Sequence, residues 1–142
     1  MPDELPSWQE VLDDLSLNFT ENAPTSPINV LDDLGFVTYR GERMPKVERI
    51  RQVVAKFDTS LPCSAHLYIS LMSFSKTFGR HKDNTDVFYI QALGKTHWVI
   101  DEDGAHEYDL IVGDMLFIPA EMFHTSQPLT PRVGLSIGLD HE

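Results

Sequence analysis

Cysteine is almost absent from this sequence: Cys63 is the only one in 142 residues. A single cysteine excludes an intrachain disulfide and a thiolate metal cluster, since both need several sulfur atoms. Cys63 follows Pro62 at the start of a β-rich segment, and we interpret it as a packing residue. The sequence also lacks a glycine-rich loop of the kind that cradles phosphates. Disulfide scaffolds and phosphate-loop enzymes are therefore not expected.

Basic residues are scarce as well, with 11 Lys and Arg against 22 Asp and Glu, for a net charge of −11. This balance argues against nucleic acid or an anionic membrane as a partner, because both are polyanions. No window approaches the ~18 consecutive apolar residues of a membrane span. The first residues, MPDELPSW, are acidic and have no apolar core, unlike a secretory signal. We expect a cytoplasmic protein without nucleic-acid or membrane partners.

Helical patterns are confined to the first 58 residues. Ser7 and Glu10 fit a capping box, and apolar residues follow it at helical spacing. Residues 18–27 are polar and contain proline, which predicts a loop. Pro45 suits the first turn of a second helix. The expected buried stripe of that helix consists of Val47, Ile50, Val53, Val54 and Phe57.

After Pro62 the sequence becomes a series of short β-rich segments separated by turn residues. The predicted strands are residues 66–74, 86–92, 95–101, 115–118, 123–126 and 133–139, with weaker candidates at 77–81 and 106–111. Asp103-Gly104 is a hairpin signal. About eight short strands without helices between them predict an antiparallel jelly roll. We therefore predict one mostly β domain, residues 1–142, with a double-stranded β-helix (jelly roll or cupin) core over 65–139. Residues 1–60 are predicted to add two helices packed outside it.

A candidate metal site begins with His81 and Asp83. Side chains at positions i and i+2 of a strand point to the same face, so these two can act together. His124 follows about 40 residues later, where a hairpin of the jelly roll can return it to His81. Two imidazoles and one carboxylate leave coordination positions free, as in non-haem Fe(II) oxygenases. A surface ion pair is the other interpretation of a His-x-Asp pair.

Several residues in order resemble a known family. The run HxDxxDVFxxQxxGxxxW, residues 81–98, resembles the metal-binding strand pair of the cupin-fold JmjC-type Fe(II)/2-oxoglutarate oxygenases, and of the ribosomal-protein and asparaginyl hydroxylases in particular. GDxLFIPxxxFH and VGLSIGL are similar to their distal-histidine hairpin and last strand. The resemblance implies a double-stranded β-helix in which His81, Asp83 and His124 are the catalytic residues that bind Fe(II). It also implies 2-oxoglutarate as cosubstrate.

The pattern breaks at Thr96. These oxygenases usually hold the distal carboxylate of 2-oxoglutarate with a Lys or Arg two residues after the glycine that Gly94 matches. Lys95 is adjacent, but alternation places it on the opposite face of the strand. The Thr96 hydroxyl can hydrogen-bond a carboxylate, but it supplies no charge.

Arg132 is a possible substitute at the start of the last predicted strand. Other branches of the superfamily, such as the prolyl hydroxylases, are similar in placing an Arg there. Small residues alternate on its side of the strand and leave room for a cosubstrate, namely Gly134, Ser136 and Gly138. An Arg that faces solvent is the alternative, and it is the commoner fate of Arg. Tyr89 and Tyr68 could offer a phenol to the same carboxylate or could simply fill the barrel.

We therefore expect an oxidoreductase, an Fe(II)- and 2-oxoglutarate-dependent dioxygenase that acts as a hydroxylase on a small-molecule or peptide substrate. A metal-dependent cupin dioxygenase or isomerase that does not use 2-oxoglutarate is the first alternative, because it accounts for Thr96. A non-catalytic small-molecule-binding cupin is the second. The sequence does not identify the substrate or the oligomeric state.

Overall fold

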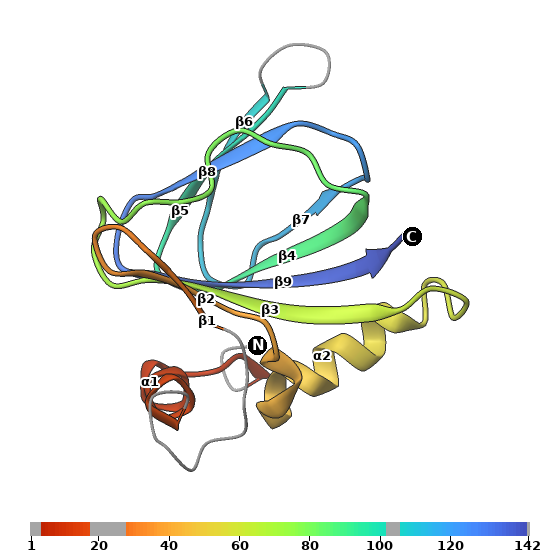
Figure 1. Ribbon diagram of the computed structural model, residues 1–142, viewed down its shortest axis with the longest axis horizontal. Helices are drawn as coiled ribbons and strands as arrows, with labels where there is room; N and C mark the ends of the chain where they lie inside the picture. Colours follow the sequence, from red (N-terminus) through yellow and green to blue (C-terminus); the bar gives the residue numbers. More distant parts are fainter. Residues whose placement is uncertain (1–3, 18–27, 102–105, 142) are drawn as a thin grey trace.

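The chain folds into two antiparallel β-sheets that face each other, seen in a computed structural model that describes residues 4–17, 28–101 and 106–141 (Figure 1). The elements, in chain order, are α1 (Trp8–Leu17), β1 (Ile28–Leu31), β2 (Gly35–Thr38), the short 3-10 helix η2 (Gly41–Arg43), α2 (Pro45–Ala55), β3 (Cys63–Ser70), β4 (Thr85–Leu93), β5 (Thr96–Ile100), β6 (His106–Leu110), β7 (Met115–Ile118), β8 (His124–Pro128) and β9 (Arg132–Asp140).

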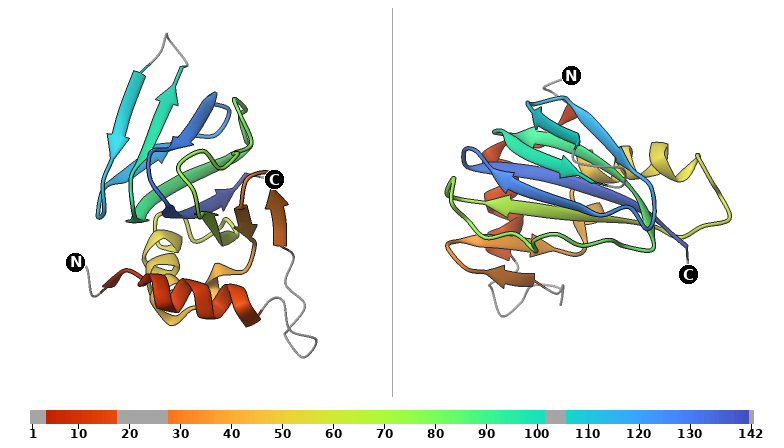
Figure 2. Two further views of the ribbon diagram at one scale, coloured as in Figure 1. Left: turned by 90° about the vertical axis from the view of Figure 1, so that its left-hand side faces the viewer. Right: turned by 90° about the horizontal axis from the view of Figure 1, so that it is seen from above.

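The larger sheet has the strand order β1-β2-β3-β9-β4-β7, and the smaller sheet has the order β6-β5-β8. Both helices lie on the outer face of the larger sheet, away from the smaller one (Figures 1 and 2). The predicted mostly β jelly roll with two N-terminal helices outside it is confirmed. No helix within the described ranges is long and apolar enough to cross a membrane.

The starts of both helices follow from local sequence. The Glu10 backbone N–H donates to Ser7 Oγ at 3.2 Å, and the Ser7 N–H donates to Glu10 Oε1 at 3.3 Å, which is the predicted capping box. Pro45 is the first residue of α2. The predicted stripe of α2 is wrong at two positions, because the side chains of Val53 and Phe57 are exposed. Val53 points away from the sheet, and Phe57 follows the end of the helix.

Strand alternation divides the molecule into two apolar clusters. The outer cluster joins the helices to the larger sheet and contains Val47, Leu67 and Leu135. The inner cluster lies between the sheets and contains Tyr89, Trp98, Ile100, Leu110 and Ile118. Along β9, residues 133, 135, 137 and 139 belong to the outer cluster, so residues 132, 134, 136 and 138 face the interior of the barrel.

Three details differ from the sequence prediction. β1 and β2, which extend the larger sheet beyond β3, were not predicted. Residues 77–81 do not form a strand; only His81 makes an isolated bridge, to His124. β3 begins at Cys63 and ends at Ser70, earlier than the predicted 66–74. The predicted loop 18–27 and the turn Asp103-Gly104 lie outside the described residues, although β5 and β6 pair as that turn requires.

Candidate metal centre

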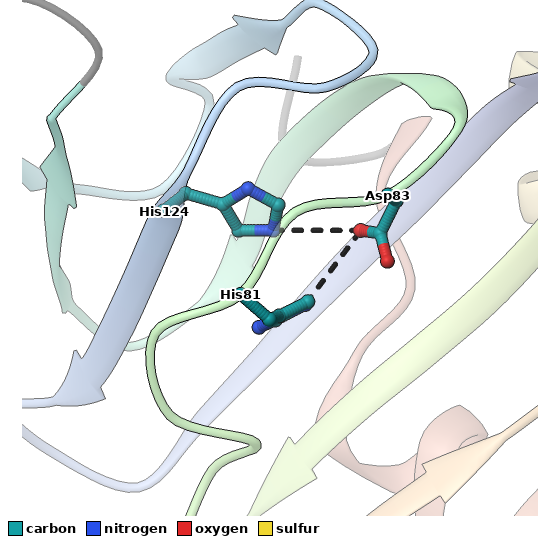
Figure 3. A group of neighbouring side chains, drawn as sticks. All are labelled: His81, Asp83 and His124. Atoms are coloured by element: carbon teal, nitrogen blue, oxygen red, sulfur yellow. Dashed lines mark ion pairs between the residues drawn. The ribbon is translucent and has the colours of Figure 1, made fainter.

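Three side chains from two segments meet between the sheets. His81 and Asp83 lie on the connection from β3 to β4, and His124 is the first residue of β8. Their imidazoles both point toward the Asp83 carboxylate (Figure 3). Asp83 Oδ2 is 3.6 Å from His81 Nε2 and 3.5 Å from His124 Nε2. One ligand atom from each residue lies within 4.8 Å of the other two, so the geometry brings together the three residues predicted to bind the metal.

Backbone hydrogen bonds fix the two segments against each other. The His81 N–H donates to the His124 carbonyl at 3.0 Å, and the His124 N–H donates back at 2.8 Å. The Asp83 carbonyl accepts from the Glu121 N–H at 2.7 Å. The separation of the ligands therefore depends on main-chain pairing and not on flexible side chains.

Each imidazole is oriented by a carbonyl oxygen. His81 Nδ1 lies 2.7 Å from the Gly79 carbonyl, and His124 Nδ1 lies 2.9 Å from the Met122 carbonyl. Since a carbonyl can only accept, both Nδ1 atoms carry the proton. Both Nε2 atoms are then left with a lone pair that faces Asp83. Hydrogen bonds of this kind are the usual support for metal-binding histidines.

The donor set suits a divalent transition metal. Burial lowers the pKa of His124, whose side chain is 7% exposed, and this favours the neutral ring that a metal needs. The three ligand atoms lie within 4.8 Å of one another, so one divalent ion could be held by all three residues. Two nitrogens and one oxygen on one side leave the opposite positions open.

The candidate metal centre forms part of the wall of a pocket of about 570 Å³, including the part that is open to solvent. We call it the arginine pocket, because Arg132 lines it together with the three metal-site residues. Arg132 is 3% exposed, so the alternative of a solvent-facing Arg is wrong. Its Nε donates to Ser70 Oγ at 3.0 Å and its Nη1 donates to Tyr89 Oη at 3.0 Å. Among the described residues, no carboxylate forms an ion pair with it.

A hydrogen-bond chain behind the pocket supports Arg132. Tyr89 is fully buried and donates to Gln91 Oε1 at 3.0 Å, so its oxygen is free to accept from Arg132. Gln91 in turn donates to the Leu93 carbonyl at 2.9 Å. A Cβ at Gly134 would overlap the Tyr89 ring, so this position must be glycine for the ring to pack here. Tyr89 thus positions the guanidinium from behind.

The other predicted cosubstrate residues differ in position. Tyr68 lines the arginine pocket, and burial together with the nearby Asp83 charge raises its pKa to about 12, so it stays a neutral phenol. Thr96 is fully buried, with Oγ1 3.4 Å from Tyr89 Oη, but does not line the pocket. Lys95 is exposed on the opposite face of β5, as alternation predicts.

Sequence reasoning missed several residues that surround the site. Ser70, which accepts from Arg132, precedes an irregular connection and carried no signal of its own. Trp98 is buried in the inner cluster, but it also lines the arginine pocket, with its ring centroid 5.8 Å from that of His124. Alternation along β3 would have found Ser70 only if the pairing of β3 with β9 were known.

A second pocket of about 410 Å³, including space open to solvent, lies on the other side of Asp83. We call it the Asp140 pocket. Its lining residues are Ser64, His66, Tyr68, Asp83, Thr85, Val87, Ser136, Gly138 and Asp140. Four of these, Tyr68, Asp83, Val87 and Ser136, also line the arginine pocket. The two pockets therefore meet at a metal-site carboxylate.

Comparison with known proteins gives one family and a set of similar folds. The JmjC domain family matches residues 39–110, half of the chain. No curated protein sequence matches. The solved structure of YcfD, a ribosomal oxygenase from Escherichia coli, in complex with cobalt and 2-oxoglutarate covers 100% of this chain at 17% identity, with a TM-score of 0.76. Oxalate decarboxylase from Bacillus subtilis covers 82% at 16% identity, with a TM-score of 0.59.

These similarities at low identity show the fold. The chain spans 45% of that YcfD chain and 28% of the oxalate decarboxylase chain. A further YcfD structure, in complex with cobalt and succinic acid, is 19% identical, with a TM-score of 0.69; the match covers 76% of this chain and 32% of that one. Both enzymes are described with a metal, and the present chain has a metal-type donor set in the same kind of fold.

Proposed function

The chain belongs to the JmjC domain family, and on this basis we propose that it is an Fe(II)- and 2-oxoglutarate-dependent oxygenase that hydroxylates its substrate. His81, Asp83 and His124 would hold the iron. When bound, the iron and the keto acid supply the oxidation: O2 gives one oxygen atom to the substrate and one to the succinate that remains after 2-oxoglutarate loses CO2. The similarity to YcfD structures with cobalt and 2-oxoglutarate supports the proposal.

The observation that carries the proposal is the buried Arg132, which lines the same pocket as the metal centre and has no carboxylate partner among the described residues. A buried cation without a counter-ion is costly, so the site favours an anion beside it. A dicarboxylate can meet both ends of this pocket, with the iron at one end and the guanidinium at the other. Ser70 and Tyr89 hold the guanidinium before the anion arrives.

The remaining side chains act on orientation and on water. The carbonyls of Gly79 and Met122 hold the proton on each Nδ1, so each Nε2 is available to the metal. Trp98 and Phe78 form apolar parts of the wall, which limits water near the metal centre. Tyr68 keeps its phenolic proton and can donate it in a hydrogen bond to a carboxylate.

An anaerobic titration of the Fe(II)-loaded protein with 2-oxoglutarate tests the proposal. We expect a visible charge-transfer band that saturates with 2-oxoglutarate. Arg132→Gln should weaken this binding by about 100-fold, because it removes a charged donor from a buried carboxylate. Lys95→Gln is the matched control: it removes the same charge from the exposed face of β5 and should leave the titration unchanged.

A metal-dependent cupin dioxygenase or isomerase that does not use 2-oxoglutarate is the second candidate. Thr96 favours it, because the cation expected at this position of β5 is missing. A wild-type protein that binds Fe(II) but develops no band with 2-oxoglutarate would select this candidate. Equal weakening by Lys95→Gln and Arg132→Gln would also contradict the assignment of Arg132.

A further inference from the structure

The Asp140 pocket differs from the arginine pocket in charge. Arg132 and Lys76 line the arginine pocket, whereas no Lys or Arg lines the Asp140 pocket. Its charged groups are the carboxylates of Asp83 and Asp140, and its other polar groups are hydroxyls and one imidazole. A bound metal would neutralise Asp83, which leaves Asp140 as the charge that a ligand would meet.

The polar groups of the Asp140 pocket have free hydrogen-bonding capacity. Asp140 Oδ1 accepts from Thr85 Oγ1 at 3.0 Å, while Oδ2 has no hydrogen bond to any described residue. The ring nitrogens of His66 likewise have no hydrogen-bond partner in the described part of the chain; the ring meets Tyr39 edge to face, with centroids 5.0 Å apart. Burial lowers the pKa of His66, so the ring is neutral and offers one donor and one acceptor.

The size of the pocket is limited by close packing at its floor. A Cβ at Gly138 would meet the methyl group of Thr85 at 2.5 Å, so β4 and β9 already approach each other as closely as glycine permits. The available space suits a small group and not a bulky ring system. Since Asp83 forms part of the wall, a group bound here lies next to the metal centre.

We propose that the Asp140 pocket is the substrate site and that it selects a substrate carrying a small primary ammonium group, with Asp140 as its counter-ion. This assignment rests on the proposed oxygenase function for its chemical consequence. Acceptor groups surround the pocket, and a cation can satisfy the free oxygen of Asp140 while a carboxylate would be repelled by it. The net charge of −11 also attracts cations to the molecule.

A binding experiment on the Zn(II)-loaded protein, in which the charge of Asp83 is compensated, tests the site without relying on turnover. ¹⁵N-labelled protein is titrated at pH 7 with n-propylamine, n-propanol and propionate, and amide shifts are followed by NMR. We expect the amine to bind more tightly than the alcohol, with propionate weakest, and the shifts to cluster at residues 64–66, 85 and 136–140. Propionate binding at these residues as tightly as the amine would overturn the proposal.

The same amine titration is repeated with the Asp140→Asn variant. The substitution keeps an oxygen for Thr85 but removes the charge, and we expect at least a fivefold loss of amine affinity. Asp109→Asn is the control: it changes the net charge equally on the exposed strand β6, and it should leave the affinity unchanged. Equal effects of the two variants would show that the amine senses only overall charge, which contradicts the site.

Addition of 2-oxoglutarate to the Zn(II)-loaded protein separates this proposal from the oxygenase assignment. Occupancy of the Asp140 pocket should survive saturation with 2-oxoglutarate, since the two ligands take different pockets. Competition between the amine and 2-oxoglutarate would overturn the proposal. If the Zn(II)-loaded wild-type protein binds the amine but does not bind 2-oxoglutarate, the proposed function is contradicted while the ammonium site still stands.

Discussion

The arginine pocket and the Asp140 pocket share a wall at Asp83, yet their charges are opposite. Strands β3, β4 and β9 contribute residues to both. Arg132 at the start of β9 lies beside Ser70 of β3, and Asp140 at the end of β9 lies beside Thr85 of β4. The sign of the charge is therefore set by position along one strand, with the metal centre between the two ends.

Opposite charges at the two ends of one strand are a simple way for a small barrel to separate the two proposed ligands. The proposed dianionic cosubstrate would be attracted to the Arg132 end and repelled from the Asp140 end, without any conformational change. The separation needs only that the interior face of β9 carries a cation first and a carboxylate last, with small residues between them.

Substitution of Asp83, which lines both pockets, should have the largest effect on metal binding and turnover. Asp83→Ala deletes one of three metal donors, and we expect metal affinity to fall by more than about 100-fold, because loss of a mere supporting group already costs ~10–100-fold. Turnover should disappear while the fold remains. Metal content after dialysis and 2-oxoglutarate decarboxylation measure this. Undiminished iron-dependent decarboxylation by the variant would refute the assignment of the metal centre.

Arg132→Gln should abolish the effect of 2-oxoglutarate on stability. A ligand at 100 times its Kd stabilises a protein by about 2.7 kcal/mol, which corresponds to a Tm increase of roughly 5–10 °C at this size. We expect this increase for Zn(II)-loaded wild type and Lys95→Gln, and little or none for Arg132→Gln. Differential scanning calorimetry provides the measurement. The variant should still bind n-propylamine, and a loss of amine binding as well would mean that the pockets are not independent.

Gly134→Ala should weaken the arginine pocket indirectly. The new Cβ overlaps Tyr89, so the ring must move, and the free energy of unfolding should fall by about 1–3 kcal/mol. Gly113→Ala is a control for backbone strain alone: its φ is 95° with no atom within 4 Å, and it should cost about 1 kcal/mol. Urea denaturation measures the free energy of unfolding of both variants and of wild type. A 2-oxoglutarate affinity unchanged in Gly134→Ala would remove Tyr89 from the support of Arg132.

The smallest effect is expected at His97, which lies outside both pockets. Hydrogen bonds to Asp109 and then Glu107 raise its pKa. A raised pKa stabilises the folded state below the ordinary His pKa of about 6.5, and this contribution is lost as pH rises through the raised value. The pair is exposed, so the contribution is well under about 1 kcal/mol. The free energy of unfolding, measured from pH 5 to 9, should show this contribution in wild type and lack it in His97→Gln. Ligand binding in both pockets should be unchanged in the variant.

Much of the barrel, and the meeting of His81, Asp83 and His124, was predictable because the signals are local. Alternating residues and turns that contain glycine mark β4 to β9. A hairpin of the jelly roll was expected to return His124 to the neighbourhood of His81 and Asp83. β1 and β2 were missed because each has four residues and the Asp32-Asp33 turn between them looks like a solvated loop. The ligand segment 77–81 was mistaken for a strand, although only one of its residues pairs.

The Asp140 pocket could not be predicted from the sequence, for a different reason. Apart from Asp83, its residues come from β3, β4 and β9, and the sequence gives no sign that Ser64, His66 and Asp140 meet. Their meeting depends on which strands are neighbours and in which register, and β9 lies between β3 and β4, far from both in the chain. Likewise, only the structure shows that Arg132 is buried.

Every residue of β9 from Arg132 to Leu139 is buried, with neighbouring strands on both sides. Amide protons of such a strand exchange with solvent only when a large part of the fold opens. Arg132, and Ser136, which lines both pockets, therefore belong to the slowest-exchanging part of the protein. The strand that places Arg132 and Asp140 can thus stay folded while a ligand enters through the part of each pocket that is open to solvent.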